Sequence, residues 1–251
     1  MAVTSTTQDG ITEIVMSHPP VNALTVGDTW AIKDAFVAAS NDPGVRAVIL
    51  TAEGKGFNAG IDIKEMQSVE GFEHLLGSSD ACLETFKAIY DTPVPVIAAV
   101  NDFCMGLGIG LVGSSDIVIA SNKARFGLPE VDNGALGCAS HLARLVPPLK
   151  LRQMTFTCIP ATAQELFEYG TVFKVTEPEE LRDEARKLAL LIAKKPASAI
   201  RFAKAALNHI DPHELHTNYR LEQGFTFQLN IMGIGDQQRD AFIDKSRDVT
   251  R

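Results

Sequence analysis

The chain has 251 residues, of which 45% are hydrophobic and 22% are charged, a balance typical of a globular protein and too apolar for a disordered one. Its 23 Lys and Arg against 31 Asp and Glu give a formal net charge of −8, which disfavours nucleic acid as a partner because binding phosphates requires clustered cations. No window approaches the roughly 18 apolar residues of a membrane span, and the polar N-terminal residues lack the features of a signal peptide. We therefore expect no membrane partner and a cytoplasmic location.

The cysteines and histidines indicate neither disulfides nor a metal site. The cysteines lie far apart without a Cys-x-x-Cys pair, and in a chain of this length we expect reduced thiols of the core. They are Cys82, Cys104, Cys138 and Cys158. His209, His213 and His216 approach the spacing of one helical face, but Pro212 interrupts the stretch, so we interpret them as a solvated helix end. We predict no bound metal.

Apolar runs rich in β-branched residues alternate with amphipathic runs along most of the chain. The apolar runs predict strands at residues 11–16, 45–51, 94–100, 116–120 and 171–175. The amphipathic runs predict helices at residues 25–40, 71–90, 106–113 and 178–194. Strands joined by helices favour right-handed crossovers and a mainly parallel sheet, hence an α/β fold.

The strand pattern ends near residue 195. Beyond it the sequence predicts helices at residues 197–208, 213–232 and 236–247. We expect an α/β core at residues 1–195 and a helical region at residues 196–251. Such a region either docks on a neighbouring subunit or covers the active site of its own chain.

Two glycine-rich junctions each link a predicted strand to a predicted helix. The first covers residues 53–66 and contains three glycines, which permit backbone conformations that other residues resist. Backbone N–H groups left free where such a helix begins can bind an anion or an oxyanion, although a plain connecting loop explains this segment equally well when it is taken alone. The second junction covers residues 101–110 and lacks the order of a dinucleotide-binding motif. Two N–H donors directed at one substrate oxygen would stabilise an enolate.

A third segment, residues 124–137, places Glu130 after Pro129 in a largely apolar neighbourhood. A carboxylate there would be partly desolvated, which raises its pKa and suits it to proton transfer. Taken alone, the segment is better explained as a surface loop with an exposed glutamate.

Together, the three segments resemble the crotonase superfamily of enoyl-CoA hydratases and isomerases, over residues 12–245. Residues 57–66 are similar to the first oxyanion segment of the family, residues 98–101 lead into the second, and residues 126–130 are similar to the segment with a catalytic glutamate. The resemblance implies a spiral core of repeated β-β-α units, an acyl-CoA substrate, and a homotrimer or dimer of trimers assembled through the C-terminal helices.

The resemblance also implies roles for backbone groups. The amides of Ile61 and Leu107 would be the two oxyanion donors. The residues implied to contact coenzyme A are Ala59, Ile61, Ile63, Phe242 and Lys245. The first three would offer their backbone near the adenine, and the lysine would pair with phosphate as a point charge. No cofactor is implied, because coenzyme A enters only as part of the substrate.

One departure from the family pattern concerns the reaction itself. Hydratases of this family carry a first catalytic glutamate at the position that here is Gly110, so only Glu130 remains as the catalytic acid or base. A single carboxylate fits a proton shuttle or hydrolysis by an activated water better than hydration with two carboxylates. Asp132 and His141 are candidate helpers, although both are more simply explained as structural residues.

Four segments carry a finer resemblance to ring-opening hydrolases of bacterial steroid degradation. They are residues 56–67, 108–113, 126–137 and 219–227. This resemblance implies retro-Claisen hydrolysis of a cyclic dione thioester, which requires a single base. A hydratase or isomerase of fatty-acid oxidation is the simpler alternative. A non-catalytic scaffold or RNA-binding relative is the alternative of another class, which Glu130 and the acidic charge disfavour.

Overall fold

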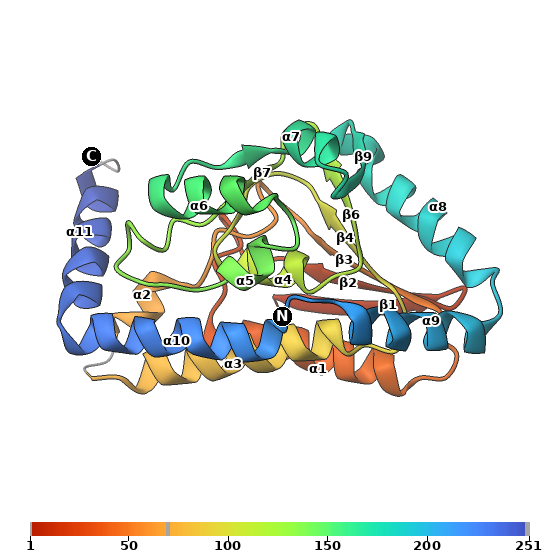
Figure 1. The fold of residues 1–251 in the computed structure, drawn as a ribbon, viewed down its shortest axis with the longest axis horizontal. Coiled ribbons are helices and arrows are strands. Elements are labelled where there is room, and N and C mark those ends of the chain that lie inside the picture. The colour runs from red at the N-terminus through yellow and green to blue at the C-terminus, as the bar shows by residue number, and fades with distance from the viewer. Residues whose placement is uncertain (1, 69–70, 249–251) are drawn as a thin grey trace.

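A six-stranded sheet forms the centre of the computed structural model, which describes residues 2–68 and 71–248 (Figure 1). Its strand order is β1-β2-β3-β4-β6-β9, and every neighbouring pair is parallel except β1 with β2. The strands are β1 (Val3–Gln8), β2 (Ile11–Met16), β3 (Ala47–Ala52), β4 (Val96–Val100), β6 (Ile117–Ser121) and β9 (Val172–Thr176). The mainly parallel sheet expected from the sequence is confirmed.

Helices cover both faces of this sheet, and further helices follow it in the chain. They are α1 (Val26–Asn41), α2 (Ile63–Met66), α3 (Glu73–Tyr90), α4 (Leu107–Gly113), α5 (Ala139–Leu142), α6 (Pro148–Thr157), α7 (Ala163–Glu168), α8 (Leu181–Ala193), α9 (Ala197–Ile210), α10 (Leu215–Ile231) and α11 (Ile234–Asp248), with a short 3-10 turn at Pro178–Glu180. Within the described residues, none of these helices is both long and apolar enough to cross a membrane.

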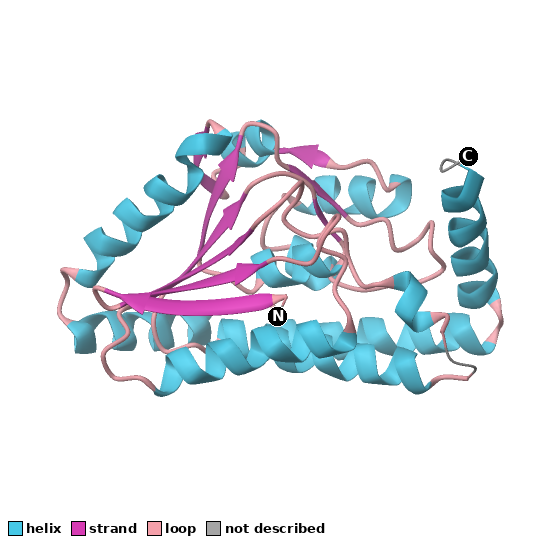
Figure 2. Cartoon of the chain, turned by 180° about the vertical axis from the view of Figure 1, so that it is seen from behind, coloured by secondary structure: helices cyan, strands magenta, loops and turns pink. Residues whose placement is uncertain are grey.

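The central strands are apolar on both sides because successive side chains of a strand point to opposite faces. In β3, Val48 and Leu50 belong to the core shared with α1, α3 and α4. Ala47 and Ile49 belong to a second core shared with α8. Figures 1 and 2 show the resulting layers, with α8 along one side of the sheet and α1 and α3 along the other. The short apolar runs of the sequence are therefore strands buried on two faces.

A second, three-stranded sheet lies beside the first and gives the fold its spiral. It consists of β5 (Cys104–Met105), β7 (Arg125–Gly127) and β8 (Ala161–Thr162). The chain passes from β4 into β5 and then α4, and from β6 into β7, so that successive turns contribute a strand to each sheet. The repeated β-β-α organisation and the helical C-terminal region expected for the crotonase fold are thus present. The described strands include four that the sequence patterns did not predict: β1, β5, β7 and β8.

The C-terminal helices return to the core rather than extending from it. Figures 1 and 2 show α10 lying along α3, and α11 turning away from α10 at one end of the molecule. Lys204 of α9 is 4% exposed and binds both oxygens of Asp116 at 2.6 and 2.7 Å, which ties α9 to the start of β6. The boundary between α8 and α9 falls near residue 195, while a division into two domains there stays a prediction.

Candidate active site

A cavity of about 150 Å³ opens where the two glycine-rich junctions, the 129–138 loop and the C-terminal helices meet. Ile61, Leu107 and Glu130 all line this cavity. Helices α2, α3, α10 and α11 also contribute lining residues, most of them apolar. The structure therefore brings the three predicted catalytic positions together from segments far apart in the sequence.

Buried asparagines hold the loop that carries Ile61. Asn58 is fully buried, its Nδ2 donates to the Asn22 carbonyl at 2.6 Å, and its Oδ1 accepts from the Gly60 amide at 2.9 Å. Gly60 has a φ of +103°, a conformation that favours glycine. Within the described residues, the Ile61 amide that follows has no hydrogen-bond acceptor. The loop therefore presents one free backbone N–H to the cavity.

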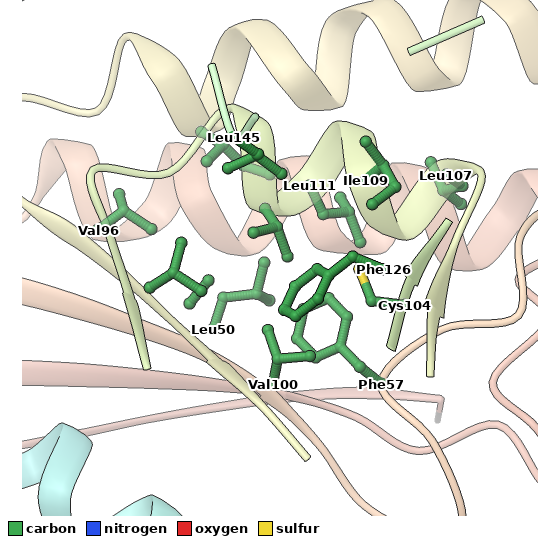
Figure 3. Packing of buried hydrophobic residues seen from close by; sticks show 14 of the residues in the cluster. Leu50, Phe57, Val96, Val100, Cys104, Leu107, Ile109, Leu111, Phe126 and Leu145 are labelled. Carbon is green, nitrogen blue, oxygen red and sulfur yellow. The ribbon is translucent and has the colours of Figure 1, made fainter. Parts of the chain in front are cut away.

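The second free amide lies at the start of α4. Leu107 is the first residue of this helix, so its N–H has no intrahelical acceptor, and no acceptor is found elsewhere in the described part of the chain. Apolar packing fixes the helix from below. Figure 3 shows Phe57, Cys104 and Phe126 gathered beneath α4, and all three belong to the main core. The Leu107 amide is therefore held by a close-packed, preorganised support.

Glu130 approaches the second junction closely. A Cβ atom added at Gly106 would lie 2.6 Å from Glu130 Oε1, so any side chain at position 106 would displace the carboxyl group. Gly106 also has a φ of +54°, which favours glycine for a second reason. Because Gly106 directly precedes Leu107, the carboxyl group lies beside the free Leu107 amide.

Burial brings the pKa of Glu130 close to neutral pH, which suits a group that both takes up and releases a proton. Desolvation raises the pKa of Glu130 from an ordinary value of 4.5 to about 8. A hydrogen bond with its own backbone opposes this rise, and the negative charge of Glu222 on α10 adds to it. Its Oε2 atom is buried without a partner among the described residues. This oxygen is therefore available to a substrate or water.

The position of a second carboxylate is closed. A Cβ atom added at Gly110 would lie 2.0 Å from the ring of Phe86, which is 1% exposed. The aromatic ring of α3 thus fills the space in which a side chain of α4 would begin. Within the described residues, Glu130 is the carboxylate that lines the cavity.

The profile of the family described as Enoyl-CoA hydratase/isomerase matches residues 6–234. The chain belongs to this family. As a member of the enoyl-CoA hydratase/isomerase family, it has the crotonase fold and is an enzyme. A crystal structure of an enoyl-CoA hydratase from Mycobacterium avium subsp. paratuberculosis K-10 superposes with a TM-score of 0.86 at 25% identity, covering 98% of this chain and 96% of that one.

Two curated relatives are 50% identical to this family member. Both are named (7aS)-7a-methyl-1,5-dioxo-2,3,5,6,7,7a-hexahydro-1H-indene-carboxyl-CoA hydrolase. The protein of Rhodococcus jostii RHA1 aligns over 98% of this chain and 96% of its own length. The protein of Mycobacterium tuberculosis H37Rv aligns over 98% of this chain and 100% of its own length.

Helix α10 adds two polar side chains from the 219–227 segment, for which the sequence predicted no individual role. Glu222 accepts hydrogen bonds from the Ala139 and Ser140 amides, both at 2.8 Å, and so binds the start of α5, which follows the Glu130 loop, to α10. Four residues further along the same helix face, Thr226 accepts from the Leu136 amide at 2.8 Å. Polar residues are frequent along α10, so no local pattern in the sequence distinguished the two residues of this clamp.

The two candidate helpers occupy other places. His141 is 1% exposed, packs against the Phe86 and Tyr219 rings, and is not among the described lining residues of the cavity. Burial lowers the pKa of His141 to about 3, so it is neutral at physiological pH. Asp132 is exposed and interacts with Cys158. The structure therefore brings neither side chain to Glu130 in the cavity.

The residues implied to contact coenzyme A are divided between two places. Ala59, Ile61 and Ile63 line the cavity on the side of the first junction. Phe242 is 49% exposed on α11. Lys245 belongs to the same helix, and its side chain lies outside the described part of the structure. Their contacts with coenzyme A stay predictions. The described residues include no cluster of three or more side chains placed to hold a metal ion.

Proposed function

We propose that this enzyme hydrolyses a C–C bond in the ring of a cyclic dione that is bound as a coenzyme A thioester. The observation that carries the proposal is the site itself: one desolvated carboxyl group at Glu130 lies beside two free amides, while Phe86 closes the position of a second carboxylate. The 50% identity to two hydrolases of an indene-carboxyl-CoA supports it. The reaction belongs to steroid degradation in this proposal.

The proposed reaction uses Glu130 twice. As a base, the carboxylate takes a proton from water while the water oxygen bonds to the ring ketone carbon. The resulting alkoxide collapses, the adjacent C–C bond breaks, and its electron pair passes through the conjugated system into the thioester. Glu130 then returns the proton to carbon. One water is consumed, and the products are a new carboxylic acid and a new C–H bond.

The backbone supplies the other half of the chemistry. When the C–C bond breaks, negative charge develops on the thioester oxygen, and the Ile61 and Leu107 amides are the donors for it. Donors fixed in a closed site cost no reorganisation at the moment of reaction, and losing one of them typically slows turnover about a hundred- to a thousandfold. The proposed reaction therefore needs no metal or redox cofactor, and coenzyme A is only the carrier part of the substrate.

The alternatives differ in what they require of the site. A hydratase of fatty-acid oxidation uses two carboxylates to position its water, and the second position is filled by Phe86. An isomerase needs a single proton shuttle, so Glu130 alone permits it. A scaffold or RNA-binding relative has no use for a carboxyl group with a raised pKa in a cavity.

We also propose that the protein is a cytoplasmic homotrimer or dimer of trimers. Large apolar side chains on α9 are exposed in the single chain: Phe202 by 76%, Leu207 by 60% and Ile210 by 71%. Association of subunits would remove this surface from water. Light scattering at micromolar concentration tests the assembly, and a stable species of about 27 kDa, the mass of one chain, would contradict it.

Turnover of three thioesters distinguishes the candidate reactions. Crotonyl-CoA, a 3-enoyl-CoA and the bicyclic dione thioester are supplied separately to the same preparation. The proposal predicts ring opening of the dione thioester and little hydration of crotonyl-CoA. Glu130→Gln should lose about a hundred- to ten-thousandfold in turnover, the usual contribution of general acid–base catalysis, while still binding butyryl-CoA. Efficient hydration of crotonyl-CoA without ring opening would overturn the proposal.

A further inference from the structure

A buried arginine lines the same cavity as Glu130. Arg239, on α11, is 7% exposed and contributes to the cavity wall. Among the described lining residues, Glu130 and Arg239 are the two with formally charged side chains, and the rest are mainly apolar. Neither the mechanism above nor any motif in the sequence gives Arg239 a role.

The arginine is held in place but is not fully paired. Its Nη2 donates to Asn230 Oδ1 at 2.7 Å and to Asp236, one turn earlier in α11. Asn230 is itself buried and donates to the Thr226 carbonyl at 2.8 Å, which joins α11 to α10. The Nε atom of Arg239 is buried without a hydrogen-bond partner among the described residues.

A buried donor without a partner costs free energy, typically about 1–3 kcal/mol and more for a charged group. A guanidinium group has five N–H donors in a planar fork, which matches the two oxygens of a carboxylate. The Nη2 side is occupied by protein groups, whereas the Nε is free. A ligand oxygen entering this apolar cavity would therefore satisfy a donor that the protein leaves open.

The proposed reaction produces one negative charge that neither Glu130 nor the amides receive. Attack of water turns the ring ketone oxygen into an alkoxide, and the charge leaves this oxygen for the thioester when the C–C bond breaks and the new carboxylic acid forms. The thioester oxygen is assigned to the Ile61 and Leu107 amides, and Glu130 carries the proton. We propose that Arg239 binds the attacked ketone oxygen of the acyl group and stabilises the alkoxide that forms there when water attacks. This inference rests on the proposed function.

Arg239→Gln and Arg239→Lys test this role. With the dione thioester, we expect Arg239→Gln to lose about a hundred- to a thousandfold in kcat/KM, as for loss of an oxyanion donor, and Arg239→Lys to recover part of it as a point charge. The affinity for butyryl-CoA, which has no ring ketone, should change less than threefold in both. Arg186→Gln is the control, because Arg186 lies on α8, across the sheet from the cavity, and pairs with Asp9 in the turn between β1 and β2. It should leave both readouts unchanged.

Each other outcome has a defined meaning. If both Arg239 variants weaken free coenzyme A and butyryl-CoA as much as the dione thioester, Arg239 binds the phosphates of coenzyme A and the inference fails. Unchanged kcat/KM in both variants also overturns it. If Arg239→Gln does not fold, as judged by circular dichroism, the Lys variant decides alone. Failure of the wild-type enzyme to open the dione ring would instead contradict the proposed function.

Discussion

Replacing Glu130 by glutamine should stabilise the folded protein at alkaline pH, although it removes the carboxyl group that we propose as the catalytic acid and base. The carboxyl group has a pKa of about 8 in the folded state and an ordinary value of 4.5. Between these two values the folded state holds a proton that the unfolded state has lost. Stability therefore falls as pH rises through this interval, because the slope follows the difference in bound protons.

The size of the effect follows from the two pKa values. The difference is about 3.5 units, and each unit corresponds to about 1.4 kcal/mol, so the wild type loses at most about 5 kcal/mol between pH 4.5 and pH 8 on account of this group. Glutamine has almost the same shape but does not ionise, so Glu130→Gln avoids the loss. Its amide still lacks a partner at the Oε2 position, as the protonated acid does, so the two proteins should be similar in stability at pH 5.

Urea unfolding of both proteins at pH 5 and pH 9 measures this difference. The protomer concentration must be held constant, because assembly of subunits also shifts apparent stability. We expect the free energy of unfolding to favour Glu130→Gln by several kcal/mol at pH 9 and by little at pH 5. A difference of the same size at both values of pH would refute the reasoning, since it would mean that the carboxyl group is not desolvated in the folded protein.

Three further substitutions test other parts of the site. Glu222→Gln removes a negative charge that raises the pKa of Glu130. The acidic limb of the pH–rate profile should therefore move to lower pH. An unmoved limb would mean that the two carboxyl groups do not interact. Gly110→Ala should destabilise the protein by about 1–3 kcal/mol in urea unfolding, because the clash with the buried Phe86 ring outweighs the gain of about 1 kcal/mol in helix propensity. A more stable variant would mean that the Phe86 ring does not fill the space beside Gly110. Lys204→Met should cost about 3 kcal/mol in the same assay, because it leaves the carboxylate at the start of β6 without its cation. A neutral result would show that this ion pair does not anchor α9.

The sequence predicted the elements that local patterns encode. The apolar runs near β3 and β4 were visible because both faces of these strands are buried, so nearly every residue is apolar. The β1 strand, Val3–Gln8, is a polar edge strand whose residues are mostly exposed, so it has no apolar alternation to detect. Strands of two or three residues such as β5 and β7 depend on pairing with each other and carry too few residues for any periodicity.

The residues of the candidate site also fall into two groups: those that the local sequence indicates and those that only the tertiary fold brings together. Local patterns indicated the two glycine-rich junctions and a desolvated Glu130. The resemblance to the family then implied roles for Ile61 and Leu107, because its motifs are contiguous in the sequence. Phe86 and Arg239 could not be predicted, because their importance depends on which distant segment they meet: the ring of α3 against α4, and the guanidinium of α11 in the cavity wall. Such contacts are decided by tertiary packing and leave no local pattern in the sequence.

Ring opening in water labelled with ¹⁸O tests the central claim most directly. The enzyme is incubated with the bicyclic dione thioester, and the product is analysed by mass spectrometry. We predict a ring-opened acyl-CoA that has gained one water, with a single ¹⁸O in a new carboxylate, and no such product from Glu130→Gln in the same time. An acyl-CoA that gains water but keeps its ring, with the ¹⁸O in a hydroxyl group, would contradict the account, because it would identify the enzyme as a hydratase.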